Sequence, residues 1–158
     1  MKILHVIDTL DIGGAERVVI TLANIFVAKE HEIGVLILLP GNHPLHNLLN
    51  KSIKIFFLNR KNKFSVLCIK EISSIAENYN IIHVHMRHNL RYIWFVSIFS
   101  SIKLEKIFFH DHYGNIGNNQ LIDVWTKKII SKSIYLGVSK ELYKWATKKC
   151  GAKKAYVL

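Results

Sequence analysis

Apolar residues along this chain gather in short runs that are separated by longer stretches of mixed polarity. Runs rich in branched and aromatic side chains occupy 2–7, 32–39, 52–58, 80–85, 106–110 and 133–138, and each predicts a buried strand. Between them, apolar positions recur at helical spacing over 15–26, 65–78, 89–102, 120–131 and 139–149, which predicts amphipathic helices. This alternation favours an α/β fold: a single Rossmann-like, doubly wound domain with a mostly parallel sheet and helices on both faces.

The last of these helices carries signals for both of its ends. Ser139 precedes it as an N-cap, and Glu141 lies in its first turn. Lys148 and Lys149 lie in its last turn, where the helix dipole favours positive charge. Gly151 stands where a C-cap glycine belongs, and a further apolar run, "AYVL", follows.

The overall charge favours an anionic partner. The chain has 22 Lys and Arg against 11 Asp and Glu, a net charge of +11, which suits nucleic acid, anionic lipid or a phosphorylated substrate. No RNP, zinc-finger or helix-turn-helix pattern is present, so we expect no nucleic acid.

Many of the positive charges lie near the end of the sequence, where Trp125 and Trp145 also lie. Basic helices that carry tryptophan can lie on an anionic membrane surface, although a solvated helical face explains the same pattern equally well. The lysines of this segment are Lys127, Lys128, Lys132, Lys140, Lys144, Lys148, Lys149, Lys153 and Lys154.

The sequence indicates neither export nor membrane insertion. Its N-terminal apolar run is too short for a signal peptide, and the longest apolar stretch, 92–102, falls well short of the roughly 20 residues that cross a bilayer. Cys68 and Cys150 show no C-x-x-C spacing, which disfavours a disulfide framework or zinc knuckle. We expect a cytoplasmic protein, with peripheral contact to the inner face of the cytoplasmic membrane.

In parallel sheets with helices on both faces, ligands bind at the carboxyl ends of the strands. After the first strand, Gly13 and Gly14 precede a helix that has Glu16 in its first turn. Glycines let backbone N–H groups approach a ligand, and a helix N-terminus favours a phosphate. The G-x-G-x-x-G and P-loop patterns are absent, and a plain tight turn with Glu16 stabilising its own helix is the alternative.

The strand at 80–85 is followed by a second polar group, "HVHMRHN". His83 and His85 alternate, so they share one side of the strand. His83, His85 and His88 could bind a metal. Arg87 among them argues against a cation and suits an anionic or hydroxyl-rich ligand better. A polar loop with one core histidine is the alternative.

The strand at 106–110 leads into a third polar group, "HDHYGNIGNN". His112 beside Asp111 could orient a substrate or stabilise developing charge. The H-D-H triplet is also compatible with a metal site, and a plain polar connection explains it as well.

The order of these motifs resembles the amino-terminal domain of GT-B glycosyltransferases, in particular the large retaining family 4. The resemblance rests on "GGAE", "IIHVH", "KIFFHDH" and "GVSKEL" in that order, and it covers almost the whole chain. It implies that 1–158 is one domain, the N-terminal half of a GT-B architecture. It also implies a hexosyltransferase-type enzyme that needs no cofactor or metal.

The resemblance also assigns donor-side roles. In that family the loop after the first strand faces the cleft between two Rossmann-like domains, against the diphosphate of the sugar nucleotide. This implies that Gly13 and Gly14 bind the donor phosphates and that Glu16 braces the loop. The family has a histidine near the transferred sugar, and His112 fits its spacing better than His110 does.

Acceptor-side roles follow from the same resemblance. His85, Arg87 and Asn89 match a region that lines the acceptor side of the cleft, and Asp111 lies beside them in our assignment. The implied function is transfer of a sugar from a nucleotide-sugar donor to a saccharide or lipid-linked acceptor in cell-surface polysaccharide or glycolipid synthesis. A non-catalytic nucleotide- or phosphate-binding module is the alternative.

One feature of the family is not found in this sequence. The family's carboxyl-terminal, donor-binding domain carries two glutamates eight residues apart. We therefore expect that domain to be absent from this chain, and the isolated chain to transfer no sugar. No two of the chain's glutamates have that spacing: they are Glu16, Glu30, Glu32, Glu71, Glu77, Glu105 and Glu141.

Overall fold

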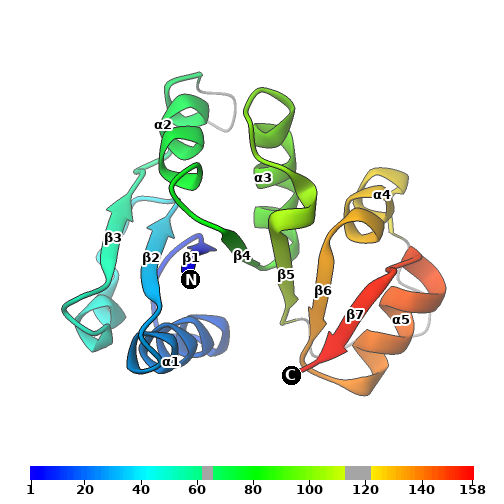
Figure 1. The fold of residues 1–158 in the computed structure, drawn as a ribbon, viewed down its shortest axis with the longest axis horizontal. Coiled ribbons are helices and arrows are strands. Elements are labelled where there is room, and N and C mark those ends of the chain that lie inside the picture. The colour runs from blue at the N-terminus through cyan, green and yellow to red at the C-terminus, as the bar shows by residue number, and fades with distance from the viewer. Residues whose placement is uncertain (62–65, 113–121) are drawn as a thin grey trace.

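A computed structural model describes residues 1–61, 66–112 and 122–158 of the chain. In this described part, all strands belong to one parallel sheet with the order β3-β2-β1-β4-β5-β6-β7 (Figure 1). The predicted α/β class is confirmed. The strands are β1 (Lys2–Ile7), β2 (Glu32–Ile37), β3 (Lys54–Phe57), β4 (Ile81–His85), β5 (Ile107–Asp111), β6 (Ile134–Gly137) and β7 (Lys154–Val157).

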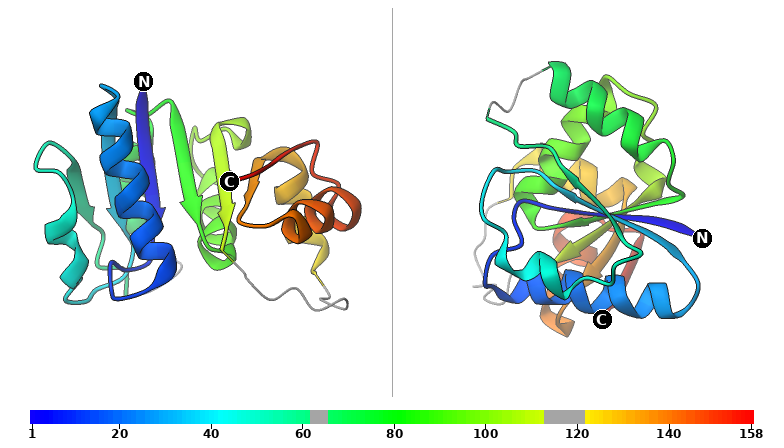
Figure 2. Two further views of the ribbon diagram at one scale, coloured as in Figure 1. Left: turned by 90° about the horizontal axis from the view of Figure 1, so that it is seen from below. Right: turned by 90° about the vertical axis from the view of Figure 1, so that its left-hand side faces the viewer.

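Helices cover both faces of this sheet. In the right-hand view of Figure 2, α1 runs along one face of the sheet and α2 lies on the other. The helices are α1 (Gly14–Ala28), α2 (Val66–Ala76), α3 (Arg87–Ile98), α4 (Val124–Lys132) and α5 (Lys140–Cys150), with short 3₁₀ helices η1 (Pro44–Leu48) and η2 (Leu104–Lys106).

Each face of the sheet has its own hydrophobic core, because successive strand residues point to opposite faces. In β1, Ile3 and Ile7 pack with α1, whereas Leu4 and Val6 belong to the larger core that includes residues of α2, α3, α4 and α5. Both cores are formed by the apolar runs that predicted the strands. A histidine or aspartate on a strand therefore faces one core or the other, depending on whether its position is odd or even along that strand.

The strand order reverses direction between β1 and β4. The chain moves outward from β1 through β2 to β3, then returns to β4 and continues to β7 on the other side. The carboxyl ends of β1 and β4 are adjacent at this switch, the usual ligand position in such sheets. The loops after β1, β4 and β5 therefore share one edge of the sheet.

The helix after β4 begins earlier than the predicted 89–102. Met86 turns the chain with a positive φ of 72°, a conformation that few non-glycine residues adopt. The helix starts directly after this turn, so Arg87 lies in the first turn of α3 and not in the loop before it, and Asn89 lies in the same turn.

The predicted caps of α5 are confirmed. The hydroxyl of Ser139 accepts a hydrogen bond from the backbone N–H of Leu142 at 3.2 Å, and Gly151 adopts a left-handed φ of 69°. The run "AYVL" contributes to β7. The predicted polar loop after Asp111 falls largely on 113–121, outside the described residues. The helix predicted from 120 begins later, at Val124, because the side chain of Asp123 caps it by accepting a hydrogen bond from the backbone N–H of Thr126.

Trp145 does not lie on the basic surface that the lysine pattern predicted. It is buried in the larger core, because α5 packs this side against the sheet and α4. Trp125 is exposed, as are the nine lysines. Among the described residues, we find no helix with both the length and the apolar character needed to cross a bilayer.

Candidate functional site

The glycine pair lies at the start of α1, after the segment that connects this helix to β1. Gly13 is the N-cap of α1 in an extended conformation, and Gly14 is the exposed first residue of the helix. A Cβ on Gly14 would have no neighbour within 4 Å, whereas one on Gly13 would collide with the carboxylate of Glu16. Neither position needs glycine for its backbone conformation. What Gly14 provides is open space in front of the unpaired N–H groups of a helix start.

Five histidines form a continuous row across the sheet, on the face that α1 covers. His5 on β1 is in register with His83 on β4, and His85 on β4 is in register with His110 on β5. His112 follows directly after β5. Neighbouring ring centroids in this row are 4.1 to 5.4 Å apart, and the ring of His5 also stacks on Phe26 of α1. We call these five residues the histidine row.

Two hydrogen bonds connect three members of the histidine row. His85 Nδ1 lies 2.9 Å from His112 Nε2, and His85 Nε2 lies 3.1 Å from His5 Nδ1. A neutral imidazole carries one proton, so His85 donates in one of these bonds and accepts in the other. The two bonds therefore run in the same direction along the row, and the tautomer of His112 is coupled to that of His5.

Burial keeps the histidine row uncharged at neutral pH. It lowers the pKa of both His5 and His110 to about 3, and it lowers the pKa of His83 and His85 well below the usual value near 6.5. The pKa of His112 is also lowered by burial, although the negative charge of Asp111 opposes this shift. The imidazoles thus meet as neutral donors and acceptors, because burial disfavours the charged form.

Asp111 and Arg87 form an ion pair on the opposite face of the sheet. Arg87 donates from Nε and from a terminal nitrogen to Oδ2 of Asp111, at 3.0 and 2.8 Å. The hydroxyl of Tyr135 donates to the same oxygen at 2.9 Å, and the guanidinium of Arg87 lies over the ring of Trp145. The carboxylate of Asp111 is 1 % exposed, so it is held inside the protein and not presented to a ligand.

The predicted site residues thus separate into three groups. His85 and His112 meet in the histidine row, Arg87 and Asp111 meet on the other face, and Gly13 and Gly14 stand at the start of α1. Asn89 serves the backbone: its side chain is buried and donates to the carbonyl of His85 at 2.9 Å. Contrary to the expectation from the sequence, Arg87 does not oppose a cation near the histidines, because Asp111 neutralises it on the far side of the sheet.

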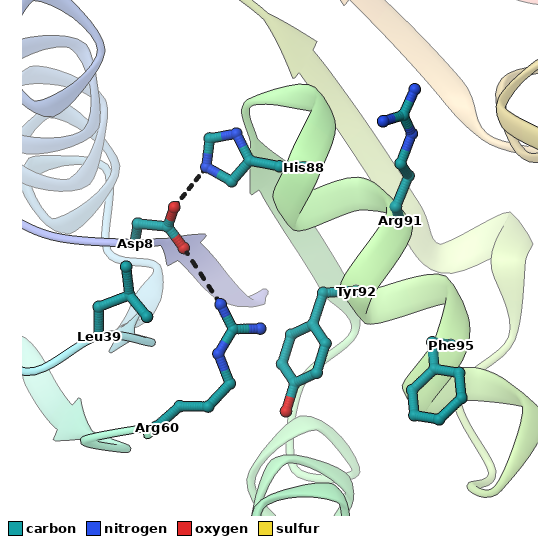
Figure 3. Close-up of a pocket in the computed structure, with 7 residues that line it drawn as sticks. All are labelled: Asp8, Leu39, Arg60, His88, Arg91, Tyr92 and Phe95. Carbon is teal, nitrogen blue, oxygen red and sulfur yellow. Dashed lines mark ion pairs between the residues drawn. The ribbon is translucent and has the colours of Figure 1, made fainter. Parts of the chain in front are cut away.

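A pocket of about 560 Å³ opens at the same edge of the sheet. It is lined by residues that follow β1, β2 and β3 and by one side of α3, as Figure 3 shows. This volume lies within the range of small-molecule sites. The lining residues are Asp8, Leu39, Arg60, His88, Arg91, Tyr92 and Phe95.

Asp8 is the central polar group of this pocket. Its carboxylate lies between His88, which contacts one oxygen, and Arg60, 3.8 Å from the other (Figure 3). The guanidinium of Arg60 lies 3.9 Å from the centre of the Tyr92 ring. The side chain of Tyr92 is buried. Burial raises its pKa, and the nearby charge of Arg60 opposes that rise. The pocket therefore offers carboxylate, guanidinium and phenol groups beside apolar rings.

Sequence reasoning did not assign His5, Asp8 or Arg60 to a site. Asp8 carried a usable signal, since it directly follows the first strand. His5 also carried one, as a polar residue within an otherwise apolar strand. Arg60 follows the third strand within "RKNK", a charged run that is typical of a solvated turn, yet Arg60 is 7 % exposed.

An α/β sheet with a strand-order switch and polar strand ends defines a Rossmann-like, ligand-binding class of protein. The sequence narrows this class further, because residues 12–154 match the family model described as Glycosyltransferase Family 4. The chain belongs to this family. The resemblance seen in its motifs is confirmed.

Solved structures with a similar fold are GT-B glycosyltransferases. The Anabaena protein Alr3699/HepE, solved in complex with UDP, superposes with a TM-score of 0.69 at 16 % identity, over 100 % of this chain and 43 % of its own. A glycosyltransferase from Rickettsia africae gives 0.68 at 20 % identity, over 99 % and 42 %. Phytolacca americana UGT2, solved with UDP-2fluoro-glucose and pterostilbene, gives 0.59 at 10 % identity, over 99 % and 52 %.

These matches concern the fold, and the chain spans less than half the length of the first two proteins. Among curated proteins, no sequence match was found.

Proposed function

We propose that this chain is the N-terminal, acceptor-side domain of a retaining glycosyltransferase. It would act with a second, donor-binding domain to transfer a hexose from a sugar nucleotide to a saccharide or lipid-linked acceptor in cell-surface polysaccharide or glycolipid synthesis. The observation that carries this proposal is the family match over 12–154, in a chain whose polar strand ends meet at one edge of the sheet. Solved relatives of the fold contain UDP or UDP-glucose, which supports a sugar nucleotide as donor.

The start of α1 is the part of the chain best suited to the leaving diphosphate. As the glycosidic bond breaks, negative charge accumulates on the departing phosphate oxygens. The unpaired N–H groups beside Gly14 and the positive end of the helix dipole are fixed in advance, so they stabilise this charge without reorganisation. The carboxylate of Glu16 lies over Gly13 and limits the approach of the anion to the Gly14 side.

His112 is our candidate for the group that contacts the transferred sugar. It lies at the end of β5, at the same edge of the sheet as Gly14, and it is less buried than the other members of the histidine row. Its Nε2 is engaged by His85 at 2.9 Å, which leaves Nδ1 for a substrate hydroxyl. A neutral imidazole suits this role, since it can donate or accept a single hydrogen bond.

The pocket around Asp8 is our candidate for the acceptor. Sugar hydroxyls need paired donors and acceptors, which Asp8, Arg60 and Tyr92 provide, and the rings of Tyr92 and Phe95 offer flat apolar surface. Closure by a second domain would exclude water and protect the donor from hydrolysis. The nine exposed lysines and the exposed Trp125 favour an acceptor held at an anionic membrane surface on the cytoplasmic side.

The donor role is tested by NMR on the isotope-labelled 158-residue chain. We expect UDP-glucose, UDP and pyrophosphate to shift the backbone amides of Gly13, Gly14 and Ala15, and glucose alone to leave them unchanged. Binding that shifts other amides while these stay still contradicts the role of the glycine pair.

Catalysis is tested separately, with a polypeptide in which this chain is continuous with a donor-binding domain, called the joined enzyme below. We expect the joined enzyme to transfer sugar and the 158-residue chain to transfer none. Nucleotide binding without transfer by the joined enzyme favours the alternative, a non-catalytic nucleotide-binding module.

A further inference from the structure

Several buried ring nitrogens of the histidine row lack a hydrogen-bond partner. Four of them have no hydrogen-bond partner in the described part of the chain: Nε2 of His5, Nε2 of His83 and both nitrogens of His110. An unpaired buried polar atom costs about 1–3 kcal/mol, and native proteins keep few of them. Imidazole nitrogen is also the most common protein ligand for transition metals.

We propose that His85, His110 and His112 bind one divalent transition-metal ion of the zinc class. One ring nitrogen from each of these residues lies within 4.8 Å of the other two. In a tetrahedral zinc site with nitrogens about 2.0–2.1 Å from the ion, neighbouring nitrogens lie about 3.3 Å apart. His85 Nδ1 and His112 Nε2 are 2.9 Å apart, so they need to separate by a few tenths of an ångström, and the nitrogen of His110 must approach them by up to about 1.5 Å.

The rest of the row supports this triad as a ligand set. With Nδ1 of His85 on the ion, its proton must lie on Nε2, which is 3.1 Å from Nδ1 of His5. His5 then accepts a hydrogen bond from a metal ligand, an arrangement that fixes the tautomer and orientation of ligating histidines. The ion would also leave the proton of His112 on Nδ1, so that this nitrogen donates.

A second triad, His5, His83 and His85, also brings its nitrogens within 4.8 Å. We favour the triad with His112 because His5, His83 and His85 are all buried. An ion among them would have neither an entry route nor space for a water ligand, and a buried charge without compensation is costly. His112 is only partly buried, which allows water to complete the coordination. Arg87 does not oppose the ion, because Asp111 pairs with it on the other face.

The ion is proposed as a structural element, and the inference does not depend on sugar transfer. The experiment therefore uses the 158-residue chain, stripped of metal by a chelator and then titrated with Co²⁺ followed by visible absorption. We expect one equivalent of tightly bound Co²⁺ that Zn²⁺ displaces. His110→Asn and His112→Asn should weaken binding by about a hundredfold or more, and His5→Phe by about 10- to 100-fold.

His83→Asn is the matched control, because His83 lies in the same row, packs against His110 and is outside the triad. It should keep Co²⁺ affinity within about threefold of the parent. Circular dichroism verifies the fold of each variant, and His112→Asn, at the partly exposed end of the row, carries the test if His110→Asn does not fold. No tight binding by the parent chain, or equal binding by the parent and His112→Asn, overturns the proposal. Loss of binding in His83→Asn but not in His112→Asn assigns the ion to the other triad and also overturns it.

Discussion

Arg87, in the first turn of α3, holds the carboxylate of Asp111, at the end of β5, through two hydrogen bonds to one oxygen. The pair lies beneath the edge of the sheet where the candidate site is formed, and Tyr135 donates to the same oxygen. It therefore connects the ends of β4 and β5 and stabilises the positions of the loops that follow them.

We expect Arg87→Met to lower the free energy of unfolding by about 3–5 kcal/mol, because it leaves the buried charge of Asp111 without its cation. Tyr135→Phe, which removes one hydrogen bond to a charged group, should cost about 1.5–3 kcal/mol. Urea denaturation of the 158-residue chain measures both. Arg91→Met is the control: Arg91 pairs with Asp123 on the surface, so its loss should cost about 1 kcal/mol or less. Equal losses for Arg87→Met and Arg91→Met would contradict this account.

Replacing a glycine by alanine should have opposite effects on stability at two positions with different surroundings. At Gly34 in β2, a Cβ would collide with the phenol of Tyr79 and approach the side chain of Leu4 to 3.0 Å. Gly34→Ala should destabilise the fold by about 1–3 kcal/mol through overpacking. Gly14→Ala places its methyl in open space at a helix start, so it should be neutral or stabilise by up to about 1 kcal/mol. Thermal unfolding of both variants checks this, and a stable Gly34→Ala would show that Tyr79 moves aside easily.

Acid should unfold the chain at mildly low pH. The pKa values of His5 and His110 are about 3 in the folded protein and near 6.5 in the unfolded chain. Below pH 6.5 the unfolded state binds more protons, so stability is present above that pH and is lost as the pH falls toward 3. Each such histidine adds about 1.4 kcal/mol per pH unit to the slope in this window. Urea titrations from pH 7.5 to 4.5, with a chelator present, measure the slope. His5→Leu should make it shallower, and an unchanged slope would contradict the burial argument.

Donor binding should be sensitive to bulk at the start of α1. Gly14→Val fills the space in front of the helix N–H groups without colliding with the protein, so we expect an intact fold and pyrophosphate affinity lowered about tenfold or more, close to 1.4 kcal/mol. Turnover of the joined enzyme should fall accordingly. Gly14→Ala, with one small methyl, is the graded control. Parental turnover in Gly14→Val would remove this turn from the phosphate site.

His112→Ala in the joined enzyme should lower kcat by about 100-fold, the usual scale for a group that contacts the reacting centre. His83→Ala, in the same row but farther from the sheet edge, should have a much smaller effect. Steady-state kinetics with fixed acceptor measure this. A rate within a factor of two of the parent for His112→Ala excludes it from the site.

The fold was predictable from the sequence because two patterns alternate along the chain. Short continuous apolar runs predicted the strands, and apolar residues at helical spacing predicted the helices. The caps at Ser139 and Gly151 were predictable for the same local reason. The early start of α3 was not, since it depends on Met86 adopting a positive φ, which local propensity disfavours.

The candidate site was less predictable, because it depends on register and parity between strands that are far apart in the sequence. "HVH" indicated that His83 and His85 share a side. Nothing local showed that β1 would bring His5 beside them. The predicted strand ended at 110, so strand alternation was not applied to Asp111 and His112, which face opposite sides of the sheet. The pocket required the same long-range information, since Asp8, Arg60 and Tyr92 come from three separate segments.

The histidine row spans the boundary between the two halves of the sheet, from β1 through β4 to β5. All five rings pack against one another, and hydrogen bonds link His5, His85 and His112, so replacing one of these three leaves a neighbour with an unmatched nitrogen. In related sequences we therefore expect these positions to change together, as a set that is either mostly imidazole or mostly aliphatic. Intermediate combinations should be rare, so related sequences would fall into two groups, one with the imidazoles and one with aliphatic residues at these positions.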